Sequence, residues 1–114
     1  QQARHEEALA ALADYTRRTP HDTRAQLDVL ATMRRLGKSD AQMLDYARSL
    51  ESTPGVGVRS AVPLAWVHRT AGRRDEAVAV LAAAGQSPDL DLETLLLVVD
   101  QLDRLDAFEV AQSL

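Results

Sequence analysis

The chain has 114 residues, enough for one domain of ordinary size and too few for two. Hydrophobic residues make up 46% of it and charged residues 26%, which excludes a disordered chain, while an aromatic content of 4% disfavours sandwiches and barrels. The formal net charge of −4 disfavours a general nucleic-acid binder, and the lack of cysteine excludes disulfides and thiolate metal sites.

Apolar residues recur at helical spacing in seven segments of the chain. Alanine and leucine, both strong helix formers, number 19 and 17 and together make up about a third of the residues. No apolar run approaches the roughly 18 residues of a membrane span, so we expect no membrane-embedded segment here. In chain order, we expect helices at about 4–18, 22–36, 39–52, 60–71, 74–85, 90–102 and 105–113.

Turn and cap signals separate these helices. Gly37 and Gly72 follow the second and fourth helices, where a left-handed residue can end a helix, and Ser39 or Asp40 can cap the third. Pro63 has no N–H and is tolerated only in a first helical turn. We therefore expect the fourth helix to begin after a Ser60 cap. In the third hairpin, we expect the turn at 103–104.

Three prolines mark an internal repeat. Pro20, Pro54 and Pro88 are 34 residues apart, and each follows a threonine or serine. Each interval holds an apolar helix, a tight turn and a second helix that contains alanine. The chain therefore divides into the second helix of one repeat at 1–20, followed by repeats at about 21–54, 55–88 and 89–114.

This pattern resembles the tetratricopeptide repeat (TPR) family, most clearly over 72–77 with Leu81 and Ala84 after it, and over Ala8, Leu12 and Tyr15 before Pro20. The resemblance implies an all-α fold: a right-handed α-solenoid of helix-turn-helix, TPR-like repeats with about seven helices. Residues 1–114 would then form a single array, which we interpret as a slice of a longer protein.

Within that family, the chain resembles the periplasmic TPR region of bacterial exopolysaccharide exporters of the Pel type, with 12 arginines against one lysine as in proteins of high-GC bacteria. The resemblance implies a non-enzymatic, periplasmic scaffold that recruits a partner protein such as a polysaccharide-modifying enzyme; a cytoplasmic location stays open. One alternative is a structural spacer between a membrane anchor and an outer-membrane pore. Another is a cytoplasmic peptide-binding TPR module.

The sequence predicts no catalytic residue, no cofactor and no metal site. His5, His21 and His68 fall on different elements and form no metal-binding pair, and the favoured interpretation of His68 is a packed, hydrogen-bonded side chain. A phosphate-binding loop follows a β-strand, and no strand is expected before the glycines at 55 and 57. Paired carboxylates stand at helix starts, where capping explains them.

Residues just off the apolar stripes of the first helices are the predicted partner-binding set. Arginine and tryptophan are enriched at interface hot spots, and this set would suit an acidic partner protein. The alternative is that Trp66 packs on the adjoining hairpin and that the arginines pair with neighbouring acids. The set comprises Arg24, Leu27, Arg34, Arg35, Arg59, Trp66 and Arg69.

The two ends of the array predict end-to-end self-association. A helical hairpin buries its apolar face against its neighbours, and the end hairpins lack one neighbour each. Leu9 and Leu12 at one end, and Val110 and Leu114 at the other, are therefore expected to be uncovered.

Overall fold

The computed structural model describes residues 2–106, which form six α-helices, one short 3₁₀ helix and no strand. The all-α prediction is confirmed, and each of the first six predicted helices lies within about two residues of its expected bounds. The predicted helix at 105–113 falls outside the described residues except for Leu105 and Asp106, which form a turn. The elements are α1 (Gln2–Arg18), α2 (Thr23–Arg35), α3 (Asp40–Glu51), η1 (Gly57–Ser60), α4 (Ala61–Thr70), α5 (Arg74–Gly85) and α6 (Leu92–Arg104).

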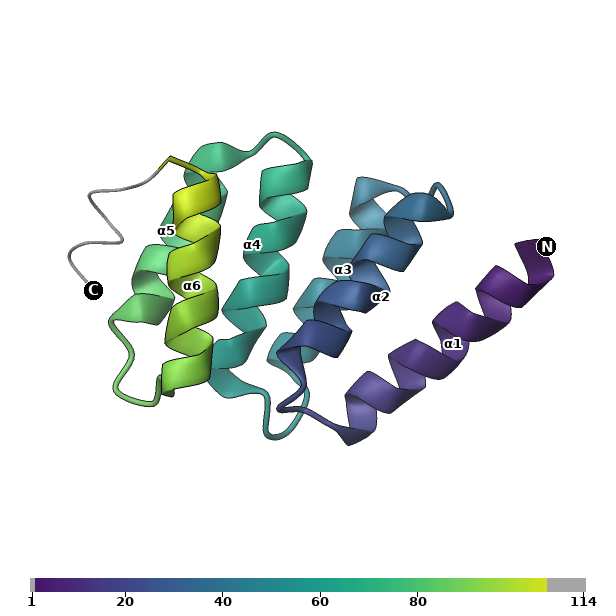
Figure 1. Cartoon of the computed structure of the whole chain (residues 1–114), viewed down its shortest axis with the longest axis horizontal. Helices are drawn as coiled ribbons and strands as arrows, with labels where there is room; N and C mark the ends of the chain where they lie inside the picture. The colour runs from purple at the N-terminus through teal and green to yellow at the C-terminus, as the bar shows by residue number, and fades with distance from the viewer. Residues whose placement is uncertain (1, 107–114) are drawn as a thin grey trace.

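The helices lie in two rows, with α1 at one end. Helix α4 contacts both α2 and α6, while α3 packs against α2 and α4, and α5 packs against α4 and α6. In Figure 1, α2, α4 and α6 follow one another across the molecule, with α3 and α5 behind them. The body measures 45 × 28 × 18 Å. None of the described helices is long and apolar enough to cross a membrane.

A left-handed residue ends each of the three helices α2, α4 and α6. Gly37 has φ 78° and Gly72 has φ 81°, as the sequence predicts. The third such residue is Asp106, with φ 57°. Aspartate is one of the few residues other than glycine that adopts this conformation readily. The prediction of a turn at 103–104 is wrong, because α6 continues through Arg104 before the left-handed residue stops it.

Local hydrogen bonds set the starts of three helices. Ser39 caps α3 in a capping box, in which the Gln42 side chain returns a bond to the Ser39 backbone. Asp22 accepts from the Ala25 N–H at the start of α2, and Asp91 does the same for α6. These caps satisfy N–H groups that have no partner inside the helix.

Helix α4 begins at Ala61, so Pro63 lies in its first turn as predicted. The predicted Ser60 cap is wrong: its side chain makes no capping bond. Its backbone is already helical, because the 3₁₀ helix η1 runs directly into α4. The connection between α3 and α4 is therefore partly helical.

The core consists of two hydrophobic clusters that meet at α4. The larger joins α4, α5 and α6 through buried residues that include Ala65, Leu81 and Leu102. The smaller joins α2, α3 and α4 through Leu30, Met43, Ala47 and Val67. Because α4 contributes to both clusters, it ties the two halves of the molecule together.

Helix α1 is held mainly by polar links. The Thr16 side chain is fully buried and hydrogen-bonds the Tyr46 hydroxyl of α3 at 2.9 Å. Glu6 pairs with Lys38 at 2.9 Å. Leu9 and Leu12 are half-buried, whereas Val110 and Leu114 lie outside the described residues. End-to-end self-association therefore stays a prediction.

Candidate partner-binding face

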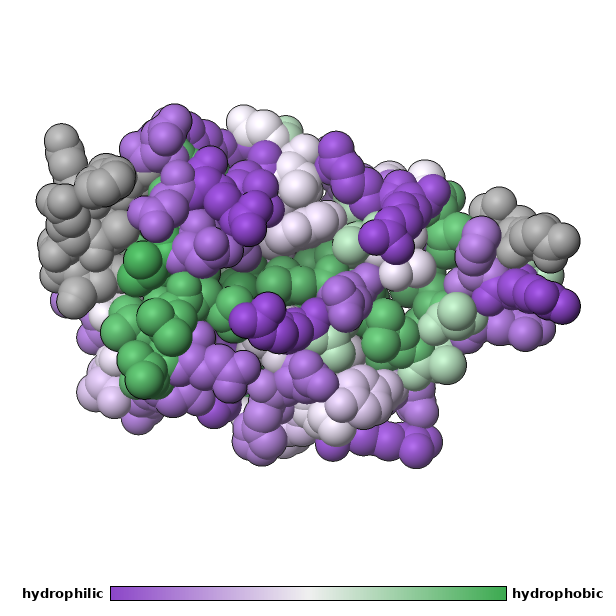
Figure 2. Space-filling model, in the orientation of Figure 1, coloured by the Kyte–Doolittle hydropathy of each residue, from purple (hydrophilic) through white to green (hydrophobic). Residues whose placement is uncertain are grey.

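The exposed side of α2, α4 and α6, hereafter the front face, carries the candidate site. Its surface is mixed: Figure 2 shows an apolar band that crosses it between charged side chains and widens at the end that holds α6. Leu92 and Leu96 of α6 are 70% and 60% exposed. The front face therefore leaves aliphatic surface in contact with solvent.

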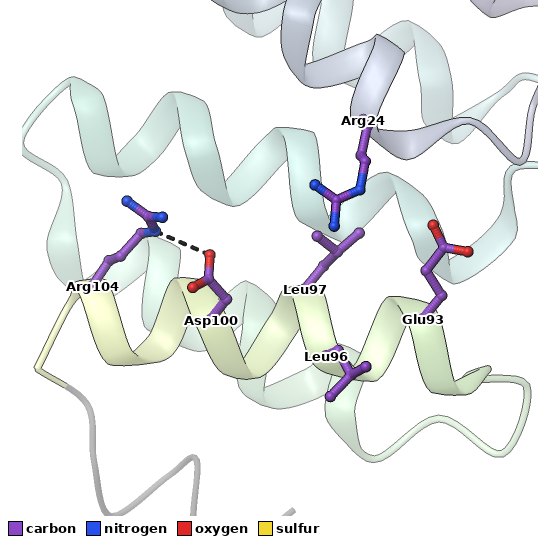
Figure 3. A pocket seen from close by; sticks show the side chains of 6 residues that line it. All are labelled: Arg24, Glu93, Leu96, Leu97, Asp100 and Arg104. Atoms are coloured by element: carbon purple, nitrogen blue, oxygen red, sulfur yellow. Dashed lines mark hydrogen bonds and ion pairs between the residues drawn. The ribbon is translucent and has the colours of Figure 1, made fainter.

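An open hollow of about 400 Å³ lies on this face. The start of α2 borders it on one side, and α6 borders it on the other along residues 93–104. Arg24 reaches across from α2 so that its guanidinium stands over Leu97, and the other lining side chains rise from α6 (Figure 3). Leu97 thus forms an apolar floor between charged groups, and Leu96 extends from the outer side of α6 (Figure 3). The lining residues are Arg24, Glu93, Leu96, Leu97, Asp100 and Arg104.

The charges in the hollow are only partly paired. Arg104 and Asp100 neutralise each other at 3.0 Å, one helical turn apart on α6. Arg24 and Glu93 make no ion pair with any residue in the described range 2–106. One cation and one anion therefore remain available to a bound group.

Two predicted partner-binding residues are partly used by the core. Leu27 packs against the cluster of α4, α5 and α6. Trp66 packs against the cluster that contains Leu30, Met43 and Val67, as in the alternative that the sequence left open. Both side chains retain some exposure. Replacing either would remove packing as well as surface.

Three of the predicted arginines link successive hairpins. Arg34 of α2 donates to the Thr70 carbonyl at the end of α4, a favourable place for a cation because helix carbonyls point there. Arg59 pairs with Asp91 at 2.8 Å and also donates to the Gly55 carbonyl. Arg69 donates to the Gln101 side chain, which in turn donates to the Val62 carbonyl. The bonds to Thr70, Asp91 and Gln101 each join residues more than 30 positions apart.

Arg24 and Arg35 are the predicted arginines without such a link. Eleven residues separate them, which is three turns of helix, so they share one side of α2. Both are exposed, and neither side chain bonds a described residue. They are the members of the predicted set that stand ready for a partner.

Sequence analysis missed the α6 half of the hollow. None of the predicted partner-binding residues lies on α6, which carries Glu93, Leu96, Leu97, Asp100 and Arg104. The run of three leucines at 95–97 carried a usable signal. Successive helical residues point about 100° apart, so three in a row cannot all face one core.

His68 lies on α4, half-buried and hydrogen-bonded. His68 accepts a hydrogen bond from Arg73 Nε at 3.0 Å, and partial burial, then the Arg73 charge, lower its pKa. The Nδ1 lone pair of His68 is thus taken up by the Arg73 guanidinium. Among residues 2–106, no group of three histidines or acids is placed to hold a metal ion.

Asp91 gives a pH-dependent test of the bonds that it accepts from Thr94 and Arg59. Bonds from the Thr94 hydroxyl and backbone N–H, and then from Arg59, lower its pKa to about 2. A carboxyl whose folded pKa lies below its unfolded value of about 3.9 stabilises the fold above about pH 4 and loses that effect as the pH falls to about 2.

We expect Asp91→Asn to flatten the dependence of the unfolding free energy on pH across this window. Urea denaturation at about pH 5 and about pH 2.5 measures it. The control is Asp75→Asn, whose side chain is 96% exposed. An unchanged slope in Asp91→Asn would show that the bonds from Thr94 and Arg59 do not lower the pKa of Asp91 in solution.

Comparison of the chain with protein families, with curated proteins and with solved structures finds no match.

Proposed function

We propose that the chain is a non-enzymatic scaffold that binds a partner protein on its front face. The observation that carries this proposal is the hollow between α2 and α6, in which the Arg24 guanidinium stands over Leu97 and has no ion-pair partner among the described residues (Figure 3). This site suits a protein segment, because the aliphatic floor buries apolar side chains of the segment and the unpaired charge orients it.

The proposed architecture is a TPR-like, right-handed α-solenoid. The left-handed residues at 37, 72 and 106 recur at intervals of 35 and 34 and support a repeated hairpin. Links between neighbouring units recur as well: Lys38 bonds Glu6, and Arg74 bonds the Leu105 carbonyl. A recurrent register between hairpins is what stacked repeats require.

The resemblance to exporters of the Pel type supplies the proposed setting. There the scaffold recruits a polysaccharide-modifying enzyme in the periplasm. A structural spacer is the second candidate, and the arginine links favour it, since they would stiffen the stack. A cytoplasmic peptide-binding TPR module would use the same front face.

Site-specific photo-crosslinking in the cell that makes the full-length protein tests the proposal. A crosslinking amino acid at position 35 reports on the front face, and one at Asp45 or Ala79, which are exposed on α3 and α5, reports on the rear row. We expect one discrete protein adduct, identified by mass spectrometry, from position 35 and none from the rear positions.

Adducts from the rear positions alone would overturn the front-face assignment. A spacer predicts no specific adduct at any position, together with loss of function when the repeat at 21–54 is deleted. Trp66→Ala is a poor probe here, because Trp66 packs against the core.

A further inference from the structure

The two walls of the hollow present different groups. The α6 wall carries Glu93 and Leu97 on the side that faces α2, four residues apart, while Leu96 extends from the outer side of the helix (Figure 3). The α2 wall carries Arg24, which faces α6 across the hollow (Figure 3). A bound segment therefore meets an acid and a leucine on one side and a cation on the other.

The spacing on α6 matches an extended peptide. Four helical residues span about 6 Å, and side chains two apart on an extended chain, which point the same way, lie about 6.6 Å apart. A basic residue opposite Glu93 would thus place the residue two positions away over Leu97. The next side chain along points to the opposite wall, where Arg24 stands.

We propose that the hollow binds an extended segment of a partner protein in which an aliphatic residue lies two positions from a basic residue and next to an acidic one. This inference rests on the proposed function and names its ligand. The basic group pairs with Glu93, the aliphatic side chain covers Leu97, and the carboxylate pairs with Arg24. The Arg104–Asp100 pair, already neutral, bounds the site at the far end.

The test uses fluorescent peptides with a central Lys-Ser-Leu-Glu, together with the reversed sequence, because the walls do not set the direction. Binding is followed by anisotropy with the 114-residue chain. The peptide should bind in one of the two sequence directions. Arg24→Glu should weaken its affinity by about fivefold or more, because a favourable exposed charge pair is replaced by a repulsive one. A peptide with lysine in place of its glutamate should bind Arg24→Glu better than it binds the original chain.

Arg48→Glu is the matched control, because Arg48 is exposed on α3, outside the hollow. It should leave both affinities unchanged, and the circular dichroism and Tm of each variant check that it folds. No binding in either direction at millimolar protein, or no exchange of preference on charge reversal, would overturn the inference. A front-face adduct from position 35 would still uphold the proposed function in that case, so the two failures are distinguishable.

Discussion

Leu102→Ala should lower the free energy of unfolding by about 3 kcal/mol, because it removes a buried side chain and leaves a cavity that its neighbours fill only in part. Leu102 is fully buried between α4, α5 and α6. For a domain of this size, such a loss lowers the Tm by more than about 10 °C. Thermal and urea denaturation followed by circular dichroism measure both quantities.

The matched control lies on the same helix. Leu96→Ala makes the same change at a side chain that is 60% exposed, and should cost less than about 1 kcal/mol. Losses of equal size in the two variants would mean that α6 packs by a different side from the one described. The pair therefore tests which leucines of α6 face the core.

Gly72→Ala should destabilise the chain by about 1–2 kcal/mol through the backbone alone. The φ of Gly72 is +81°, where a Cβ is strained against the following carbonyl, and a Cβ built there would meet no other atom within 4 Å. Urea denaturation monitors the loss. Because neither a cavity nor a clash contributes, the loss of stability measures the cost of the left-handed backbone conformation alone.

The same substitution at Gly85 should have the opposite sign. Gly85 is the last residue of α5, and alanine in a helix is favoured over glycine by up to about 1 kcal/mol. If Gly72→Ala proved neutral while Gly85→Ala stabilised, the left-handed turn between α4 and α5 would be wrong. Opposite signs would confirm both backbone assignments.

The helices and most of their boundaries could be predicted because the interactions that set them are local. Apolar periodicity, the glycines at 37 and 72, and the capping serine at 39 act within a few residues, so they can be read along the chain. The same local view misplaced the third turn, where Asp106 adopts the conformation that glycine holds in the other two.

Half of the candidate site could also be predicted. Arg24 was identified as an off-stripe residue, and it does line the hollow. The opposite wall was missed, because which of three successive leucines on α6 faces outward depends on how α6 is rotated against α4 and α5. That rotation is set by the shape of the packed core and has no marker within α6 itself.

By itself, the sequence determined the class of fold, the positions of six helices and the turns at Gly37 and Gly72, since each depends on neighbours a few residues away. Only the tertiary structure decided which off-stripe side chains remain available. Arg34, Arg59 and Arg69 look alike in sequence to Arg24 and Arg35, yet each reaches a partner more than 30 residues away. Such partners meet only when one hairpin stacks on the next, because helix packing brings distant residues within hydrogen-bond distance.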